Sequence, residues 1–73
     1  MGAGSLSYRD LVKGLRCFGF DEPRHGKRHP FMVRGTFKLR IPNDHGAVIS
    51  GPKIDDVLEA AGISLEEWNE RNS

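Results

Sequence analysis

The most basic stretch of the chain, residues Arg24–Ile41, also holds two histidines, His25 and His29. This basic strip contains no acid and six of the eleven Lys and Arg residues: Arg24, Lys27, Arg28, Arg34, Lys38 and Arg40. A histidine titrates near neutral pH, so it can accept or donate a proton. Neighbouring cations can hold a phosphate and stabilise the charge that builds on it. The strip therefore predicts proton transfer on a phosphate, with His29 as the catalytic residue.

RNA is the ligand that this pattern favours. The cations expected to contact its backbone are Arg24, Lys27, Arg28, Lys38 and Arg40, and Phe31 is expected to stack on a base. We expect single-stranded RNA, because its splayed bases can reach such a face. Two simpler interpretations stay open. The cations could simply form a solvent-exposed face that protects an edge strand from aggregation, or they could bind an acidic protein partner.

A metal site is the competing interpretation of His25, His29 and His45. The first two are four residues apart, but they fall in a turn and a strand, and no HExxH motif or cysteine pair accompanies them. We expect no metal and no other cofactor. His45 lies in an Asp-His-Gly sequence typical of a turn, so it either shapes the loop or approaches His29 as a secondary site residue.

Size and composition indicate one small domain. The chain has 73 residues, 37% of them hydrophobic and 29% charged. We expect a flexible N-terminus over residues 1–4 and a single domain over residues 5–73. The lone Cys17 excludes an internal disulfide. No signal peptide is recognisable and no apolar run approaches the roughly 20 residues that cross a bilayer, so a cytoplasmic protein without membrane contact is expected.

Apolar periodicity predicts helices at both ends of the chain. A helix over Ser7–Phe18 would begin with a capping box formed by Ser7 and Asp10. A second helix would begin at Ser50-Gly51-Pro52, with Ser50 as its cap, and end at Gly62. Ser64 would cap a short last helix that runs to about Asn72. The apolar side chains expected to pack these helices against the core are Tyr8, Leu11, Val12, Leu15, Phe18, Ile54, Val57, Leu58, Ala61, Ile63, Leu65 and Trp68.

The basic strip itself predicts two strands, Pro30–Val33 and Thr36–Ile41, after a short extended piece toward Arg24. We expect Arg34 and Gly35 to form the turn, which would pair Val33 with Thr36 and place Phe31 opposite Lys38 and His29 opposite Arg40. The predicted fold is α+β in the order α-β-β-β-α. Two helices would cover one face of a three-stranded antiparallel sheet and leave the basic face open, and residues 42–50 would form a loop.

In this order of elements, the chain resembles the HicA-type (YcfA-like) mRNA interferase toxins of toxin–antitoxin systems. The matching features are the first helix, the Gly-x-x-His step at Gly26–His29, Ile41-Pro42 and His45-Gly46. The match closes with Ala-Gly-Ile-Ser at residues 61–64. Lys27 and Arg28 depart from the family pattern, and Pro30 directly follows His29.

The resemblance implies a double-stranded-RNA-binding-domain-like fold with a short extra C-terminal helix. It implies a metal-independent endoribonuclease of the stress response, which cleaves mRNA with His29 and binds no DNA on its own. It also implies a HicB-type antitoxin that covers the active face. The alternative within the same fold is a non-catalytic RNA-binding module.

Overall fold

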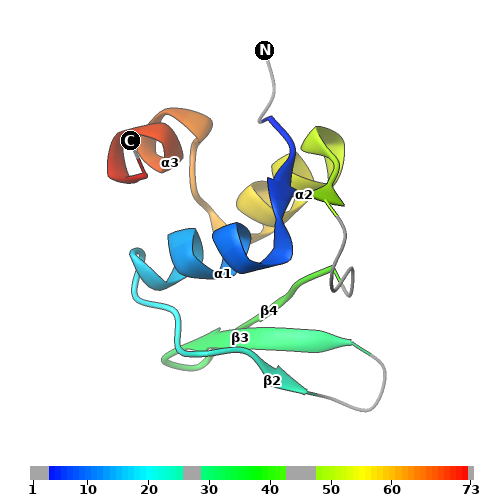
Figure 1. Ribbon diagram of the computed structural model, residues 1–73. Helices are drawn as coiled ribbons and strands as arrows, with labels where there is room; N and C mark the ends of the chain where they lie inside the picture. Colours follow the sequence, from blue (N-terminus) through cyan, green and yellow to red (C-terminus); the bar gives the residue numbers. More distant parts are fainter. Residues whose placement is uncertain (1–3, 26–28, 43–47, 73) are drawn as a thin grey trace.

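The computed structural model describes residues 4–25, 29–42 and 48–72, and Figure 1 shows how they fold. The bounds of the elements are β1 (Leu6–Ser7), α1 (Tyr8–Arg16), β2 (Arg24–His25), β3 (Pro30–Arg34), β4 (Phe37–Arg40), β5 (Val48–Ile49), α2 (Gly51–Ala61) and α3 (Leu65–Arg71). This confirms a small α+β domain with a three-stranded antiparallel sheet. None of the described helices has the length and apolar character needed to cross a membrane.

The sheet has the strand order β2-β3-β4, with every pair antiparallel. Its hairpin confirms both predicted strands but not the predicted register. Met32 pairs with Leu39, and Phe31 pairs with Arg40 rather than with Lys38. The hydrogen bond from the Ile41 amide to the Pro30 carbonyl (3.2 Å) continues the same register. The predicted pairing of His29 with Arg40 is therefore wrong.

The position of the turn explains the difference in register. The turn is formed by Gly35 and Thr36, not by Arg34 and Gly35, and Gly35 has a φ of 62°. A positive φ at the first central residue and not at the second matches the type II′ hairpin turn, which prefers glycine at that place. Moving the turn by one residue shifts each pairing by two positions, so every side chain stays on the face that the alternation predicted.

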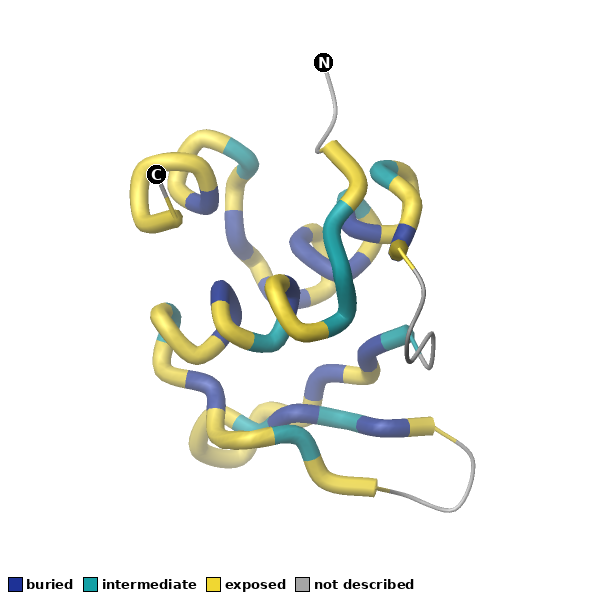
Figure 2. Tube along the Cα trace, in the orientation of Figure 1, coloured by how far each residue is buried: buried dark blue, intermediate teal, exposed yellow. Residues whose placement is uncertain are grey.

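The three helices lie on one side of the sheet, and the buried residues lie between the helices and the sheet and among the helices themselves (Figure 2). The core consists of Leu11, Leu15, Phe20, Met32, Leu39, Ile41, Ile49, Ile54, Val57, Leu58, Ala61, Ile63 and Trp68. From β3 and β4 it takes the alternate residues Met32 and Leu39, both almost fully buried. Their strand neighbours must therefore point to the other face, which no described helix covers.

The predicted caps form at two of the three helices. The Ser7 hydroxyl accepts a hydrogen bond from the Asp10 amide, and the Ser64 hydroxyl accepts one from the Glu67 amide, each at 3.1 Å. Ser50 is the N-cap residue of α2, as predicted, but its side chain makes no capping hydrogen bond. At its other end α2 stops as predicted, because Gly62 adopts the left-handed conformation with a φ of 73°.

A close contact between α1 and α3 holds the C-terminal helix in place. The Trp68 ring lies against the backbone of Gly14 and stacks on Phe18, with ring centroids 6.0 Å apart. A Cβ atom at Gly14 would lie 2.8 Å from Cζ2 of Trp68 and closer still to Cη2. Glycine is therefore required here for packing, although it is a poor helix former.

Two very short strands lie outside the three-stranded sheet and were not predicted. Leu6 of β1 pairs with Ile49 of β5, and Ser7 pairs with Val48. The pairing joins the start of α1 to the start of α2, far apart in sequence, and it falls partly within the predicted loop at residues 42–50. Ile49 is fully buried, so this pair anchors the chain just before α2.

Candidate nucleic-acid interface

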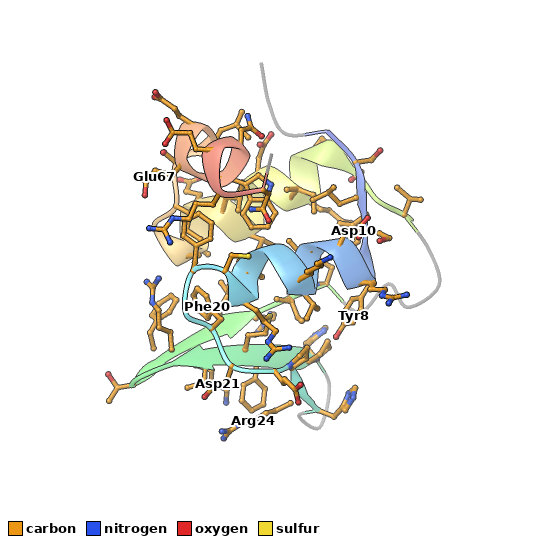
Figure 3. All side chains as sticks on the ribbon, turned by 60° about the vertical axis from the view of Figure 1, so that its left-hand side comes forward. Tyr8, Asp10, Phe20, Asp21, Arg24 and Glu67 are labelled. Atoms are coloured by element: carbon orange, nitrogen blue, oxygen red, sulfur yellow. The ribbon has the colours of Figure 1, made fainter. Side chains whose placement is uncertain are left out.

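The uncovered face of the sheet carries a row of three side chains, one from each strand. Arg24 pairs with Phe31, and Phe31 pairs with Arg40, so the three side chains lie side by side across the sheet. Both arginines are exposed and Phe31 is half-buried. Figure 3 shows Arg24 on the side of the sheet away from α1. The row places two guanidinium groups on either side of an aromatic ring, the combination predicted for RNA.

Lys38 completes this open face. Its ammonium group lies 4.2 Å from the centroid of the Phe31 ring, in cation–π contact. A base that stacked on that side of the ring would have to displace the ammonium, at a cost of about 0.5–1 kcal/mol for an exposed contact. The displaced ammonium would stay close enough to meet a phosphate. We call Arg24, Phe31, Lys38 and Arg40 the open-face cluster.

Arg34 belongs to the basic strip in sequence but not to the open face. Its guanidinium donates a hydrogen bond to the Phe18 carbonyl (3.3 Å) and lies 4.6 Å from the centroid of the Phe20 ring. Arg34 pairs with Phe37, and the Phe37 ring in turn contacts Phe20 edge-on at 6.1 Å. The side chain therefore closes the end of the core on the helix side of the sheet.

His29 lies just before β3 and is exposed. It lines a pocket of about 470 Å³ between the end of β4 and α2. His29, Arg40, Ile41 and Pro42 form the sheet side of this pocket, and Lys53, Asp56, Val57 and Ala60 form its helix side. The structure thus brings the proposed catalytic histidine and one open-face arginine to a common concave surface.

The remaining predicted site residues fall into two groups. His25 is exposed in β2 and pairs with Pro30, so it lies on the face opposite to Arg24. Gly26, Lys27, Arg28 and His45 lie outside the described residues. Within the described part of the chain, no three His, Cys, Asp or Glu side chains gather in a group that could hold a metal ion.

The helix side of the pocket was not predicted from the sequence. Lys53, Asp56, Val57 and Ala60 follow the spacing i, i+3, i+4, i+7, so they share one face of α2. This spacing was readable in the sequence. Val57 also belongs to the buried apolar stripe of α2, so its position alone indicates a core residue. Only the packing of α2 beside the end of β4 shows that this face of the helix lines a pocket.

The comparisons with known proteins give no independent identification. No family model matches the chain, and no curated protein or solved structure is significantly similar to it.

Proposed function

We propose that this protein is a small metal-independent endoribonuclease that binds single-stranded mRNA on the open face of its sheet. The observation that carries the proposal is the row Arg24–Phe31–Arg40 on that face, with Lys38 above the Phe31 ring. Cations that follow a backbone, combined with an aromatic platform for bases, are the usual elements of single-strand recognition. The resemblance to the HicA-type toxins supports the same assignment.

His29 is the proposed acid or base. It shares the pocket surface with Arg40, so a phosphate held by the arginine would lie near the imidazole. In the reaction, a 2′-hydroxyl loses its proton and attacks the adjacent phosphorus, and the bond to the 5′-oxygen breaks. The products are a 2′,3′-cyclic phosphate and a 5′-hydroxyl, which takes up a proton. Arg40 would stabilise the charge on the phosphorane.

One specific observation favours a second candidate function, a non-catalytic RNA-binding module. His29 makes no hydrogen bond or ion pair with the other described residues, so none of them orients its ring for proton transfer. Pro30 also restricts the His29 backbone to extended conformations. In this second function the open-face cluster binds RNA in the same way, but no bond is broken.

As the cellular partner we propose a HicB-type antitoxin that covers the open face and blocks access to His29. Such a protein would have to compete with RNA for Arg24 and Arg40. Acidic groups that complement the cationic face would serve this purpose, since charge complementarity speeds association and fixes the register of a complex.

The test is incubation of the purified protein with an end-labelled single-stranded RNA in the presence of EDTA. We expect the wild type to produce fragments with 2′,3′-cyclic phosphate ends, and His29→Ala to fold normally and lose about 10²–10⁴-fold in rate, as is typical for a general acid or base. Equal cleavage by the two proteins would refute the role of His29. Binding by both without cleavage would establish the second function instead.

A further inference from the structure

The pocket beside His29 has an apolar wall that backbone binding on the open face does not use. Its volume of about 470 Å³ falls in the roughly 300–1,000 Å³ range of small-molecule sites, which combine apolar walls with a few polar groups. Pro42 approaches from the sheet side, and Val57 and Ala60 approach from α2. A fully extended phosphate backbone offers nothing to fill such a surface.

The pocket has polar groups on both sides. His29 and Arg40 come from the sheet side and connect the pocket to the open face, whereas Lys53 and Asp56 come from α2, and Asp56 is the one acid among the described lining residues. A nucleotide has a matching distribution. Its phosphate is an anion, its base has apolar faces, and the edge of the base carries hydrogen-bond donors and acceptors.

We propose that the pocket binds one unpaired nucleobase of the RNA, with the adjoining phosphate at Arg40 and His29. This inference rests on the proposed function, which it deepens by naming a base-recognition site. The base lies between Pro42 on one side and Val57 and Ala60 on the other, and its edge meets Asp56. A strand bound in this way enters from the open face and leaves one base in the pocket.

Asp56 gives this site a direction of selectivity. An ionised carboxylate accepts hydrogen bonds and donates none. Guanine offers it two adjacent N–H groups, and adenine and cytosine each offer an exocyclic amino group. Uracil offers a single N–H flanked by two carbonyl oxygens, which the carboxylate repels. The site therefore prefers guanine and disfavours uracil, and because Asp56 is exposed we expect the lower end of base discrimination, about fivefold.

The first experiment titrates the protein with guanosine, adenosine, cytidine and uridine 5′-monophosphates while the methyl NMR signals of Val57 and Ala60 are followed. Ribose 5-phosphate is the control for the phosphate alone. We expect both signals to shift with the guanosine and uridine nucleotides, with an affinity about fivefold lower for the uridine nucleotide, and not to shift with ribose 5-phosphate. In Asp56→Asn the ratio of the guanosine affinity to the uridine affinity falls to about one, because an amide offers a donor as well as an acceptor. Shifts that are equal for ribose 5-phosphate and all four nucleotides would overturn the inference.

A pair of variants on α2 separates the pocket from the proposed function. Ala60→Leu fills the pocket, whereas Glu59→Leu places the same side chain at the neighbouring exposed position, which does not line the pocket. We expect Ala60→Leu to lose nucleotide binding by at least about tenfold and to lose the base preference at the RNA cleavage site, while Glu59→Leu keeps both. If RNA is bound or cut and Ala60→Leu keeps the wild-type preference, the base pocket is wrong and the proposed function stands. If RNA is neither bound nor cut but the guanosine nucleotide still shifts Ala60, the proposed function is wrong and the pocket stands.

Discussion

Replacing the two arginines of the open face should reduce the salt dependence of RNA binding by a calculable amount. Each phosphate contact on a single strand contributes about −0.7 to the slope of log K against log salt concentration. Arg24, Lys38 and Arg40 are the described cations of this face, so together they account for a slope of about −2. We expect the slope for the variant Arg24→Gln/Arg40→Gln to be shallower than that of the wild type by about 1.4 units.

The structure supplies a matched control within the same stretch of sequence. Arg34 is also a cation of the basic strip, but its guanidinium binds the Phe18 carbonyl on the helix side of the sheet. Arg34→Gln removes one charge, as each open-face substitution does, and should leave the slope within about 0.2 units of the wild type, because no phosphate contact is lost.

The assay is fluorescence anisotropy with a short labelled single-stranded RNA between about 50 and 300 mM salt, with circular dichroism to confirm that each variant folds. The His29→Ala background prevents cleavage during the titration. A change of about 0.7 units in Arg34→Gln, equal to that of Arg24→Gln, would refute the reasoning. Binding would then follow the net charge of the strip rather than the geometry of the open face.

Three further predictions concern the scaffold and the partner. Gly14→Ala gains about 1 kcal/mol of helix propensity but forces Trp68 to move, at a cost of about 1–3 kcal/mol, so thermal unfolding should show a net fall in the melting temperature of several degrees. Trp68→Phe gives a smaller ring and should offset that loss in the double variant. The control Lys13→Ala, on the exposed side of α1, should change the melting temperature little. Additive effects of Gly14→Ala and Trp68→Phe on the melting temperature would contradict a direct contact between the two residues. Burial raises the pKa of the Tyr8 hydroxyl above 10.0, so the unfolded chain ionises first and the free energy of unfolding should fall as the pH rises through about 10. Urea unfolding from pH 8 to 11 should show this fall in the wild type and not in Tyr8→Phe, and parallel curves would argue against it. Finally, an acidic HicB-type antitoxin should displace labelled RNA from the wild type and bind Arg24→Gln/Arg40→Gln more weakly; equal affinity for both proteins in calorimetry would place the antitoxin elsewhere.

Much of the fold could be read from the sequence because local chemistry determines it. Ser7 and Ser64 cap their helices, Gly62 ends α2, and the alternation in β4 identifies Leu39 as a core residue. The hairpin register could not be read as reliably, since Gly35 serves equally well at the first or the second central position of a two-residue turn. The buried face decides which residues point inward, but it does not distinguish registers that differ by two positions.

The candidate site was predictable in its charge but not in its shape. Alternation was sufficient to place Phe31, Lys38 and Arg40 together on one face. The separate role of Arg34 depends on contacts with Phe18 and Phe20, which the sequence does not place beside it. The pocket joins residues near 41 to residues near 57, and no local rule connects segments so far apart along the chain.

The central claim, that RNA binds the open face of the sheet, is tested most directly by following the arginine side-chain Nε–H signals in NMR spectra of the His29→Ala protein. A short single-stranded RNA should shift the signals of Arg24 and Arg40 and leave those of Arg34 and Arg71 in place, because the latter two bind the carbonyls of Phe18 and Cys17 on the helix side. Shifts at Arg34 and Arg71 without shifts at Arg24 and Arg40 would contradict the account and place the RNA on the helices.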